Sequence, residues 1–333
     1  MSLLPATPAG IAAAVDRLRQ GGLLGLPTET VYGLAADATQ PAAVAAVFAI
    51  KGRPGNHPLI VHVADAAAAR QWAADWPEAA ARLAAAFWPG PLTLVVPRGA
   101  AVLSAVTGGQ DTVALRVPQH PLAQAVLRQF AGAVVAPSAN RYGRLSPTRA
   151  ADVIAEFGPA LAVLDGGECS VGLESTIVAC LRNEVRVLRP GILTPTAISR
   201  VTGTEVIMGA GEHDPRVPGA VKAHYAPRAP LELVPLANLA ARLRHCPQAA
   251  VVARQSPDGE VPGQADRIRV LPADPLPFGR MLYATLRDLD ALEVPRVLVV
   301  EPPAGEAWAA VRDRLVRAAA AGGVDSTGDA PHD

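Results

Sequence analysis

Two cations on a glycine- and proline-rich turn are the residues of this 333-residue sequence best suited to holding an anion. Lys51 and Arg53 lie in the run KGRPG (51–55), which ends a stretch whose apolar residues have helical spacing. A hydroxyl-rich turn containing Thr30 precedes that stretch, and His62 follows it inside a short apolar run, 59–63. Residues 26–63 therefore predict an anion site made from a turn, a helix end and a strand. A lone histidine in a strand is also compatible with a plain core position.

Lysine occurs only at positions 51 and 222, among 30 basic residues. A compact ammonium is not equivalent to a planar guanidinium, so a position that keeps lysine in an arginine-rich chain is a candidate point charge for phosphate. The alternative is chance, because two residues of a long chain must fall somewhere. The motif context favours the phosphate interpretation for Lys51 and leaves Lys222 undecided.

An arginine lies inside an apolar run at 112–117, where Thr112 and Arg116 share one face because side chains alternate along a strand. Burying a guanidinium alone is costly, so Arg116 is expected to pair with a fixed anion. That anion is either a carboxylate of the protein, in a structural salt bridge, or the carboxylate of a ligand.

Further polar clusters follow other expected strands. PSAN (137–140) comes after a strand at 132–136 and carries Ser138 and Asn140, with Ser146 soon after. GLEST (172–176) brings Ser175 to the start of the next strand, and Arg189 ends the one after it. Ser-Pro-Thr at 146–148 is also compatible with a helix cap. Because ligands favour strand ends in α/β sheets, these clusters predict one groove lined from several strands.

Composition narrows the class of protein. Half of the residues are hydrophobic and the formal net charge is zero, which argues against a strongly basic nucleic-acid binder. The three cysteines have no metal-ligand spacing, so neither a metal site nor a disulfide framework is expected and a reducing, cytoplasmic location is predicted. No signal peptide and no apolar run of membrane-spanning length is recognisable.

The periodic segments predict an α/β fold with a mixed sheet, an RN hairpin turn at 182–183, and a second small α/β unit. The predicted organisation is a catalytic domain at 8–203, a linker or lid at 204–230, a C-terminal domain at 231–320 and a disordered tail at 321–333. Helices are expected at 8–20, 41–50, 65–73, 77–87, 120–131, 149–157, 237–245, 278–292 and 308–319. Strands are expected at 22–26, 59–63, 92–97, 112–117, 132–136, 161–165, 175–181, 184–189, 231–234, 249–254, 267–271 and 296–301.

No P-loop or other familiar nucleotide fingerprint is present. Instead the runs PTETVYGLAADA, KGRP with PLIVHV downstream, PSAN, GLESTIV, RPG and GAVKAHYAP occur in this order. Together they resemble the YrdC-like threonylcarbamoyl-AMP synthases, in the long form with an extra C-terminal domain, over residues 8–320. The resemblance implies a twisted mixed sheet flanked by helices with a central groove, plus a small Rossmann-like domain.

The resemblance also implies an activity. These enzymes make L-threonylcarbamoyladenylate and pyrophosphate from L-threonine, bicarbonate and ATP, for N6-threonylcarbamoyladenosine next to the tRNA anticodon. A downstream tRNA transferase is the implied partner, Mg2+ is expected with the triphosphate, and no dedicated metal site is expected. By this likeness Lys51 and Arg53 are catalytic, and L-threonine is bound by Thr30, His62, Arg116 and Ser175. ATP is bound by Arg53, His57, Thr112, Ser138, Asn140, Ser146, Arg189 and Tyr225.

The sequence departs from the family pattern at His57, where an asparagine is often found, and at Asp313, where long members usually have asparagine. Because Tyr225 lies in the linker, the linker is expected to fold over the groove and exclude water from a labile acyl-adenylate. The alternative functions are a binding protein of the same fold for double-stranded RNA or tRNA, and a carbamoyl-transfer enzyme. The latter needs zinc-finger segments that the cysteine spacing does not supply.

Overall fold

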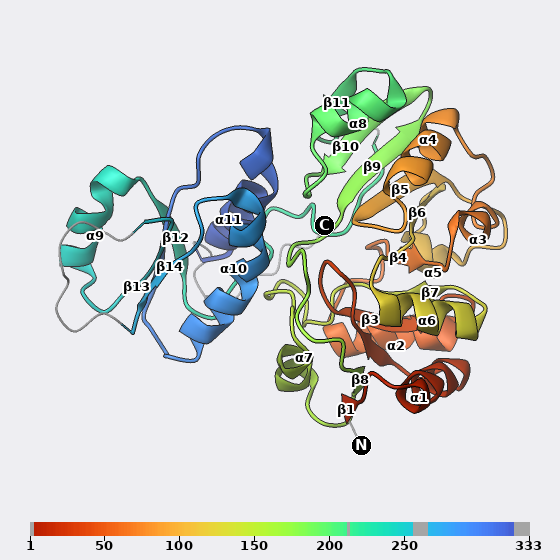
Figure 1. Ribbon diagram of the computed structural model, residues 1–333, viewed down its shortest axis with the longest axis horizontal. Helices are drawn as coiled ribbons and strands as arrows, with labels where there is room; N and C mark the ends of the chain where they lie inside the picture. Colours follow the sequence, from red (N-terminus) through yellow and green to blue (C-terminus); the bar gives the residue numbers. More distant parts are fainter. Residues whose placement is uncertain (1–2, 212–213, 256–265, 323–333) are drawn as a thin grey trace.

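The computed structural model describes residues 3–211, 214–255 and 266–322, which form two domains joined by a linker (Figure 1). An 11-stranded sheet with the order β1-β8-β2-β3-β7-β4-β6-β5-β9-β10-β11 forms the larger domain. Parallel and antiparallel pairs both occur in it, so the predicted mixed sheet is confirmed. A 4-stranded, all-parallel sheet, β12-β15-β13-β14, forms the C-terminal domain, which confirms the predicted small α/β unit.

The elements of the larger domain have the following bounds. Its strands are β1 (Leu3–Leu4), β2 (Leu24–Leu26), β3 (Gly33–Asp37), β4 (Ile60–His62), β5 (Leu92–Pro97), β6 (Thr112–Arg116), β7 (Val134–Val135), β8 (Ala162–Leu164), β9 (Thr176–Leu181), β10 (Glu184–Arg189) and β11 (Val206–Met208). Its helices are α1 (Pro8–Arg19), α2 (Pro41–Lys51), α3 (Ala66–Arg70), α4 (Glu78–Phe87), α5 (Ser104–Thr107), α6 (Pro121–Phe130), α7 (Ala150–Phe157) and α8 (Pro195–Thr202).

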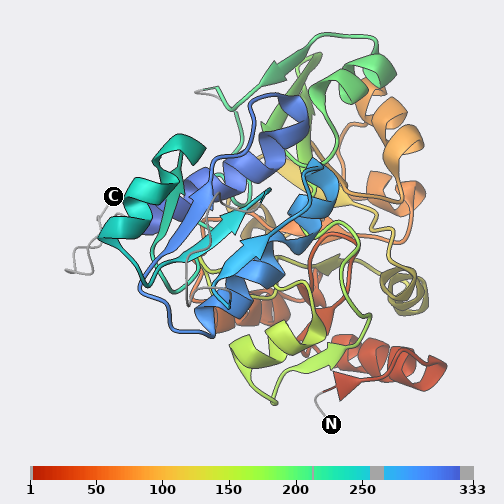
Figure 2. The same cartoon turned by 60° about the vertical axis from the view of Figure 1, so that its left-hand side comes forward.

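The C-terminal domain contains β12 (Leu231–Val234), η1 (Leu236–Asn238), α9 (Leu239–His245), β13 (Ala250–Ala253), β14 (Ile268–Val270), α10 (Pro275–Asp290), β15 (Val297–Val300), η2 (Glu306–Trp308) and α11 (Ala309–Gly322). Helices α10 and α11 lie between its sheet and the larger domain, and α9 lies on the far side (Figures 1 and 2). Residues 321 and 322, predicted to belong to a disordered tail, are instead the last residues of α11. Residues 323–333 lie outside the described residues.

Local chemistry explains the elements that carry the site. Helix α2 starts on a proline and stops at Gly52, which has the left-handed φ of 62° that ends helices readily. The turn at Arg182 and Asn183 has positive φ at both residues, as predicted for the hairpin that joins β9 to β10. Five elements of the larger domain were not predicted from the sequence: β1, β3, α5, α8 and β11, the last of which lies in a stretch without a periodic pattern.

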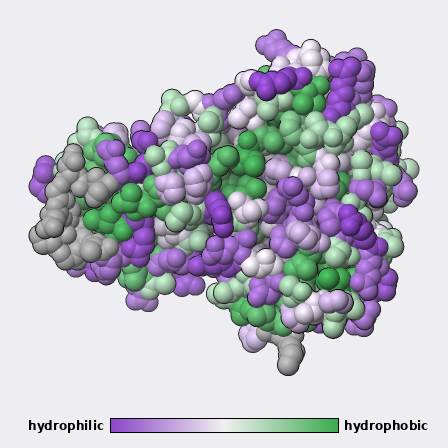
Figure 3. Space-filling view, in the orientation of Figure 1, coloured by the Kyte–Doolittle hydropathy of each residue, from purple (hydrophilic) through white to green (hydrophobic). Residues whose placement is uncertain are grey.

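One hydrophobic cluster crosses the domain boundary. It contains Val31 and Leu173 of the larger domain, Tyr225 of the linker, and Phe278 and Leu315 of the C-terminal domain. The surface of both domains on the face shown in Figure 3 mixes polar and apolar side chains. The two domains therefore share a buried interface beside the linker.

Candidate active site

A small cavity, about 40 Å³, is the place where the structure brings the predicted residues together. Eight of them line it: Thr30, Arg53, His62, Arg116, Ser138, Ser175, Arg189 and Tyr225. They come from loops next to β3, β7 and β9, from the turn after α2, from β4, β6 and β10, and from the linker. The expected convergence of separate strands on one groove is therefore present.

Arg116 is the last residue of β6 and lines the cavity. Its Nη2 donates to Glu29 Oε1 at 2.7 Å, and Glu29 Oε2 accepts from the backbone N–H of Gln119 at 3.0 Å. Within the described residues, the buried Nε of Arg116 has no hydrogen-bond partner. A structural salt bridge thus fixes one edge of the guanidinium and leaves Nε able to bind an anionic ligand.

His62 pairs with Arg116 across the β4–β6 ladder and is 2% exposed. Burial, assisted by the positive charge of Arg116, lowers the pKa of His62 to about 3. The neutral ring places Nδ1 3.1 Å from the carbonyl oxygen of Ile60, so Nδ1 is assigned as the donor. The Nε2 atom is then an acceptor suited to a ligand hydroxyl or ammonium group.

Ser175 lies between two partners at the start of β9. Its Oγ is 2.7 Å from Thr93 Oγ1, and the Nη2 of Arg189 donates to the same Oγ at 3.1 Å. Arg189 also donates from Nη1 to the carbonyl oxygen of Pro218 in the linker at 3.0 Å. Arg189 therefore joins the GLEST loop to the linker across the cavity.

Of the two cations of the KGRPG turn, Arg53 lines the cavity. Arg53 donates from Nη2 to Pro58 O at 2.8 Å, and its guanidinium lies 6.0 Å from the centre of the Tyr142 ring. Burial lowers the pKa of Arg53 to about 10. Lys51 does not line the cavity; its Nζ donates to the backbone oxygens of Ser138, at 2.6 Å, and Asn140.

The pKa of Lys51 is lowered well below its usual value by burial and by the neighbouring Arg53. An anion next to this ammonium raises its pKa again, because opposite charge favours the charged form. Lys51 thus holds the PSAN loop through two backbone carbonyls, and a nearby phosphate would stabilise the charged form of its ammonium group.

Four other predicted residues also lie outside the cavity lining. His57 Nδ1 is 3.4 Å from Tyr142 OH, and Thr112 starts β6 at the end of the strand away from Arg116. The side-chain N–H groups of Asn140 donate to loop carbonyls, and Ser146 donates to Glu174 Oε1 at 2.5 Å. The structure places Asn140 and Ser146 in the walls of the site.

The linker closes the cavity. His224 and Tyr225 line it, and their rings contact each other with centroids 4.2 Å apart. Burial lowers the pKa of His224 to about 3. In the part of the chain that the structure describes, His224 Nδ1 and Tyr225 OH are buried without hydrogen-bond partners, as are Arg53 Nε and Asn140 Oδ1. The site therefore holds several polar atoms that a ligand could satisfy.

Sequence reasoning assigned no role to Glu29, Glu174 or His224, which complete the site. All three lie inside runs that carry the resemblance, PTET, GLEST and AHYAP. The sequence signal for these residues was a carboxylate or imidazole side chain between apolar neighbours, because such a side chain needs a partner if it is buried. The arginine partners of Glu29 and Glu174 are distant in sequence, so no local pattern identifies these two carboxylates.

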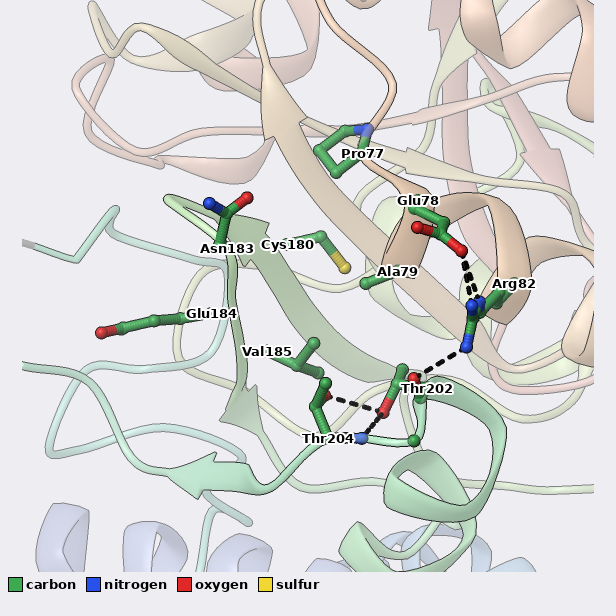
Figure 4. Close-up of a pocket in the computed structure, with 11 residues that line it drawn as sticks. Pro77, Glu78, Ala79, Arg82, Cys180, Asn183, Glu184, Val185, Thr202 and Thr204 are labelled. Atoms are coloured by element: carbon green, nitrogen blue, oxygen red, sulfur yellow. Dashed lines mark hydrogen bonds and ion pairs between the residues drawn. The ribbon is translucent and has the colours of Figure 1, made fainter.

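A larger cavity, about 360 Å³, lies elsewhere, between α4, the β9–β10 hairpin and the end of α8 (Figure 4). Arg82 pairs there with Glu78 and donates to the carbonyl oxygen of Thr202 at 3.2 Å. None of the predicted site residues lines it. Volume alone therefore does not mark the reactive site.

The described residues contain no group of three or more His, Cys, Asp or Glu side chains placed to hold a metal ion. Glu29 and Glu174, the carboxylates next to the cavity, are both paired with arginines. No described helix has the length and apolar character needed to cross a membrane.

Both domains of the chain match known protein families. Residues 16–191 match a family described as "Telomere recombination", and residues 193–320 match the "Threonylcarbamoyl-AMP synthase, C-terminal domain". Threonylcarbamoyl-AMP synthases of Bacillus subtilis and Pyrococcus abyssi are 42% and 41% identical over 228 and 229 residues, 67% of this chain and 66% and 67% of theirs.

The crystal structure of P. abyssi Sua5 complexed with L-threonine superposes with a TM-score of 0.87 at 33% identity, covering 96% of this chain and 98% of that one. The match therefore includes both the mixed-sheet domain, which contains the polar cavity, and the small parallel-sheet domain. The chain belongs to the Sua5-type threonylcarbamoyl-AMP synthases, the nucleotidyltransferases of tRNA threonylcarbamoyladenosine biosynthesis.

Proposed function

We propose that the cavity seats L-threonine next to ATP, and that the chain makes L-threonylcarbamoyladenylate there from L-threonine, bicarbonate and ATP. The amino group of threonine is carboxylated by bicarbonate with loss of water. An oxygen of the new carbamate attacks the α-phosphate, and the bond to pyrophosphate breaks. The observation that carries the proposal is that one cavity is lined by Arg116, His62 and hydroxyl side chains and also by the cation Arg53.

The Arg116 end suits an amino acid. The Nε of Arg116 is placed to bind a carboxylate, and neutral His62 is placed to accept a hydrogen bond. Ser175 and Thr30 add hydroxyls on the same side. Since Glu29 fixes the guanidinium before any ligand arrives, little rotamer entropy is lost on binding.

The Arg53 end suits phosphate. Negative charge accumulates on the α-phosphate and on the leaving pyrophosphate, so fixed cations that need no reorganisation lower the barrier. Arg53 supplies one such cation in the lining, and Lys51 holds the PSAN loop that carries Ser138. We assign Arg189, Asn140 and Ser146 to the nucleotide side, with His57, Thr112 and Tyr225 contacting it from the periphery.

The linker acts as a lid in this proposal. A cavity of about 40 Å³ is far smaller than the roughly 300 Å³ or more of sites that hold small-molecule ligands. His224 and Tyr225 must therefore swing out to admit the substrates and return over them. Closure then excludes water from the acyl-adenylate and from its carbamate precursor.

Mg2+ is expected to arrive with the triphosphate. Because Glu29 and Glu174 are both engaged by arginines, phosphate oxygens and waters would supply most of its ligands. The product is a mixed anhydride that a downstream tRNA transferase consumes.

Pyrophosphate release in the presence of ATP, bicarbonate and labelled L-threonine tests the proposed function. Release that requires both L-threonine and bicarbonate, together with label in an adenylate, is the expected result. Release that continues without L-threonine would remove the proposal. Replacing L-threonine by L-valine is a matched control, because the isosteric side chain lacks only the hydroxyl.

A further inference from the structure

The carboxylate of Glu174 lines the cavity and is held by residues of both domains. It accepts hydrogen bonds from Ser146 Oγ of the larger domain and, across the interface, from Tyr283 OH at 3.1 Å and Arg314 Nε at 2.7 Å. Burial by itself raises the pKa of Glu174, but Arg314, Arg189 and the Ser146 hydrogen bond lower it to about 2. The carboxylate is therefore a fixed negative charge next to Ser175.

Arg314 of α11 is fully buried, although it belongs to the domain that does not form the cavity. Its Nη1 donates to the carbonyl oxygen of Pro190, the residue after Arg189, at 3.0 Å. Its guanidinium also lies 5.1 Å from the centre of the Tyr225 ring. One side chain thus contacts the GLEST loop, the RPG loop and the linker.

The same helix holds the linker from a second point. Arg317 donates to the carbonyl oxygens of Ala220 and Val221 at 2.8 and 2.6 Å, and the backbone N–H of His224 donates to Arg317 O at 3.2 Å. Asp313 pairs with both Arg314 and Arg317 and so orients the two guanidiniums. These two ion pairs give Asp313 a structural role that requires no ligand.

Close backbone approach keeps the GLEST loop against the C-terminal domain. A Cβ atom at Gly172 would lie 2.5 Å from Arg280 Cα, and one at Gly279 would lie 2.8 Å from Leu173 Cδ1. The loop that supplies Glu174 and Ser175 therefore packs directly on α10, and at Gly172 it meets the backbone of Arg280.

We infer that Arg314 is a positioning residue of the synthase reaction, through which the C-terminal domain fixes the GLEST loop and the closed linker together. Arg314 is not among the residues that line the cavity. It holds Glu174, and through Glu174 the walls at Ser146 and Ser175, while its guanidinium supports the Tyr225 ring. The inference rests on the proposed function for its kinetic consequence, but its structural consequence can be measured separately.

The two lysines of the chain provide that measurement. Lys51 is 3% exposed and hydrogen-bonded, whereas Lys222 is exposed in the linker. A lysine-specific protease acting on the native full-length chain therefore reports opening of the linker through cleavage after Lys222. Cleavage of a transiently opened segment follows the population of the open form when closing is fast.

Arg314→Met tests the inference, with Arg312→Met as the matched control. Arg312 lies on the same helix but is exposed, and within the described part of the chain it donates only to the carbonyl oxygen of Pro302. We expect Arg314→Met to be cleaved after Lys222 about tenfold faster and to show a raised KM for L-threonine and a lower kcat. Arg312→Met should match the unaltered chain, and Arg314→Lys should recover part of the protection.

The double variant Glu174→Gln/Arg314→Met covers the case in which the single variant does not fold. It removes both charges, so no uncompensated buried carboxylate remains, and it should fold while its linker is still cleaved faster. Cleavage of folded Arg314→Met, or of the folded double variant, at the rate of the unaltered chain would overturn the inference. If the unaltered chain released no threonine-dependent pyrophosphate while the cleavage difference persisted, the proposed function would fail and the positioning role would stand.

Discussion

Around the cavity, the larger domain buries Arg53, His62, Arg116, Glu174 and Arg189, whereas the buried polar side chains of the C-terminal domain, in its described residues from 231, are Thr285 and Arg314. The sheet of the C-terminal domain packs Val251, Leu298 and similar residues into an ordinary apolar core. The buried charge of Arg314 points into the other domain. Burying charge costs free energy, so its concentration at one cavity marks where ligands are handled.

That contrast assigns different tasks to the two domains. In our proposal the larger domain supplies the groups that meet the substrates, and the C-terminal domain supplies a rigid support for the loop and the linker around them. Replacing a buried charged side chain should accordingly reduce activity more when that side chain lies closer to the proposed ligands.

The largest effect is expected at Arg116. The Arg116→Ala variant removes the group proposed to bind the carboxylate of L-threonine, and it leaves Glu29 buried without its ion pair. The kcat/KM should therefore fall at least about 100-fold. Most of the loss should appear as weaker L-threonine binding, measured by calorimetry. Arg116→Lys keeps a cation for Glu29 without the fork, and should fold normally yet bind L-threonine weakly. Unchanged L-threonine affinity in both variants would contradict the assignment.

A somewhat smaller effect is expected at Lys51. Removing its ammonium in Lys51→Ala frees the carbonyls of Ser138 and Asn140, so the KM for ATP should rise roughly 10- to 100-fold. L-threonine affinity in the absence of ATP should stay the same, which a calorimetric titration would check. Lys222→Ala is the control in the linker, because that lysine is exposed. An equal rise in the KM for ATP in Lys51→Ala and Lys222→Ala would contradict a specific role of Lys51 on the nucleotide side.

Closure of the linker can be weakened at a single glycine. Gly219 has a φ of +77°, and a Cβ atom there would lie 2.0 Å from the Tyr225 hydroxyl oxygen. Gly219→Ala should therefore hold the linker open and lower kcat about tenfold, since the clash adds to the usual cost of about 1 kcal/mol for a left-handed residue.

Gly209→Ala is a matched control for Gly219→Ala. Gly209 has a φ of +82°, but a Cβ atom added there would meet no heavy atom within 4 Å, so the substitution introduces the backbone strain without the clash. A kcat that falls equally in both variants would assign the effect to strain and not to closure.

The last effect is a dependence of stability on pH, which between pH 7 and pH 4.5 is expected on the cavity side of the molecule. The folded-state pKa values of His62 and His224 are lowered from 6.5 to about 3, so the unfolded chain binds more protons and stability falls as pH drops from 6.5 towards 3. Glu174, whose pKa is lowered from 4.5 to about 2, adds a further loss below pH 4.5.

Hydrogen exchange at pH 7 and pH 4.5 would locate this loss. Amides of β4, β6 and the linker should lose protection on acidification, and those of β13 and β15 should not. Equal loss in both sheets would mean that the buried charges do not distinguish the two domains.

Several features of the molecule followed from the sequence because their causes are local. Apolar runs such as 92–97 and 112–117 became β5 and β6, and the RN turn became a hairpin, since alternation and turn chemistry act over a few residues. Strand β3 was not predicted, because its sequence, GLAAD, has small residues and no β-branched ones; its pairing with β2 and β7 determines it.

The sequence predicted only those site residues that lie in recognisable motifs. Arg116 and Ser175 lie in runs whose residue types suggest chemistry, and both line the cavity. Glu174 and Arg314 are 140 residues apart and belong to different domains, so their pairing leaves no trace in local spacing. Tertiary packing alone created that contact, as it created the position of Lys51 behind the PSAN loop.

A crystal structure of the chain with L-threonine and a non-hydrolysable ATP analogue tests the central claim most directly. The account predicts the threonine carboxylate at Arg116 Nε, the phosphates next to Arg53 and Ser138, and the amino group facing the α-phosphate, with Tyr225 closed over both. L-threonine and nucleotide on separate surfaces, or threonine bound away from Arg116, would contradict it.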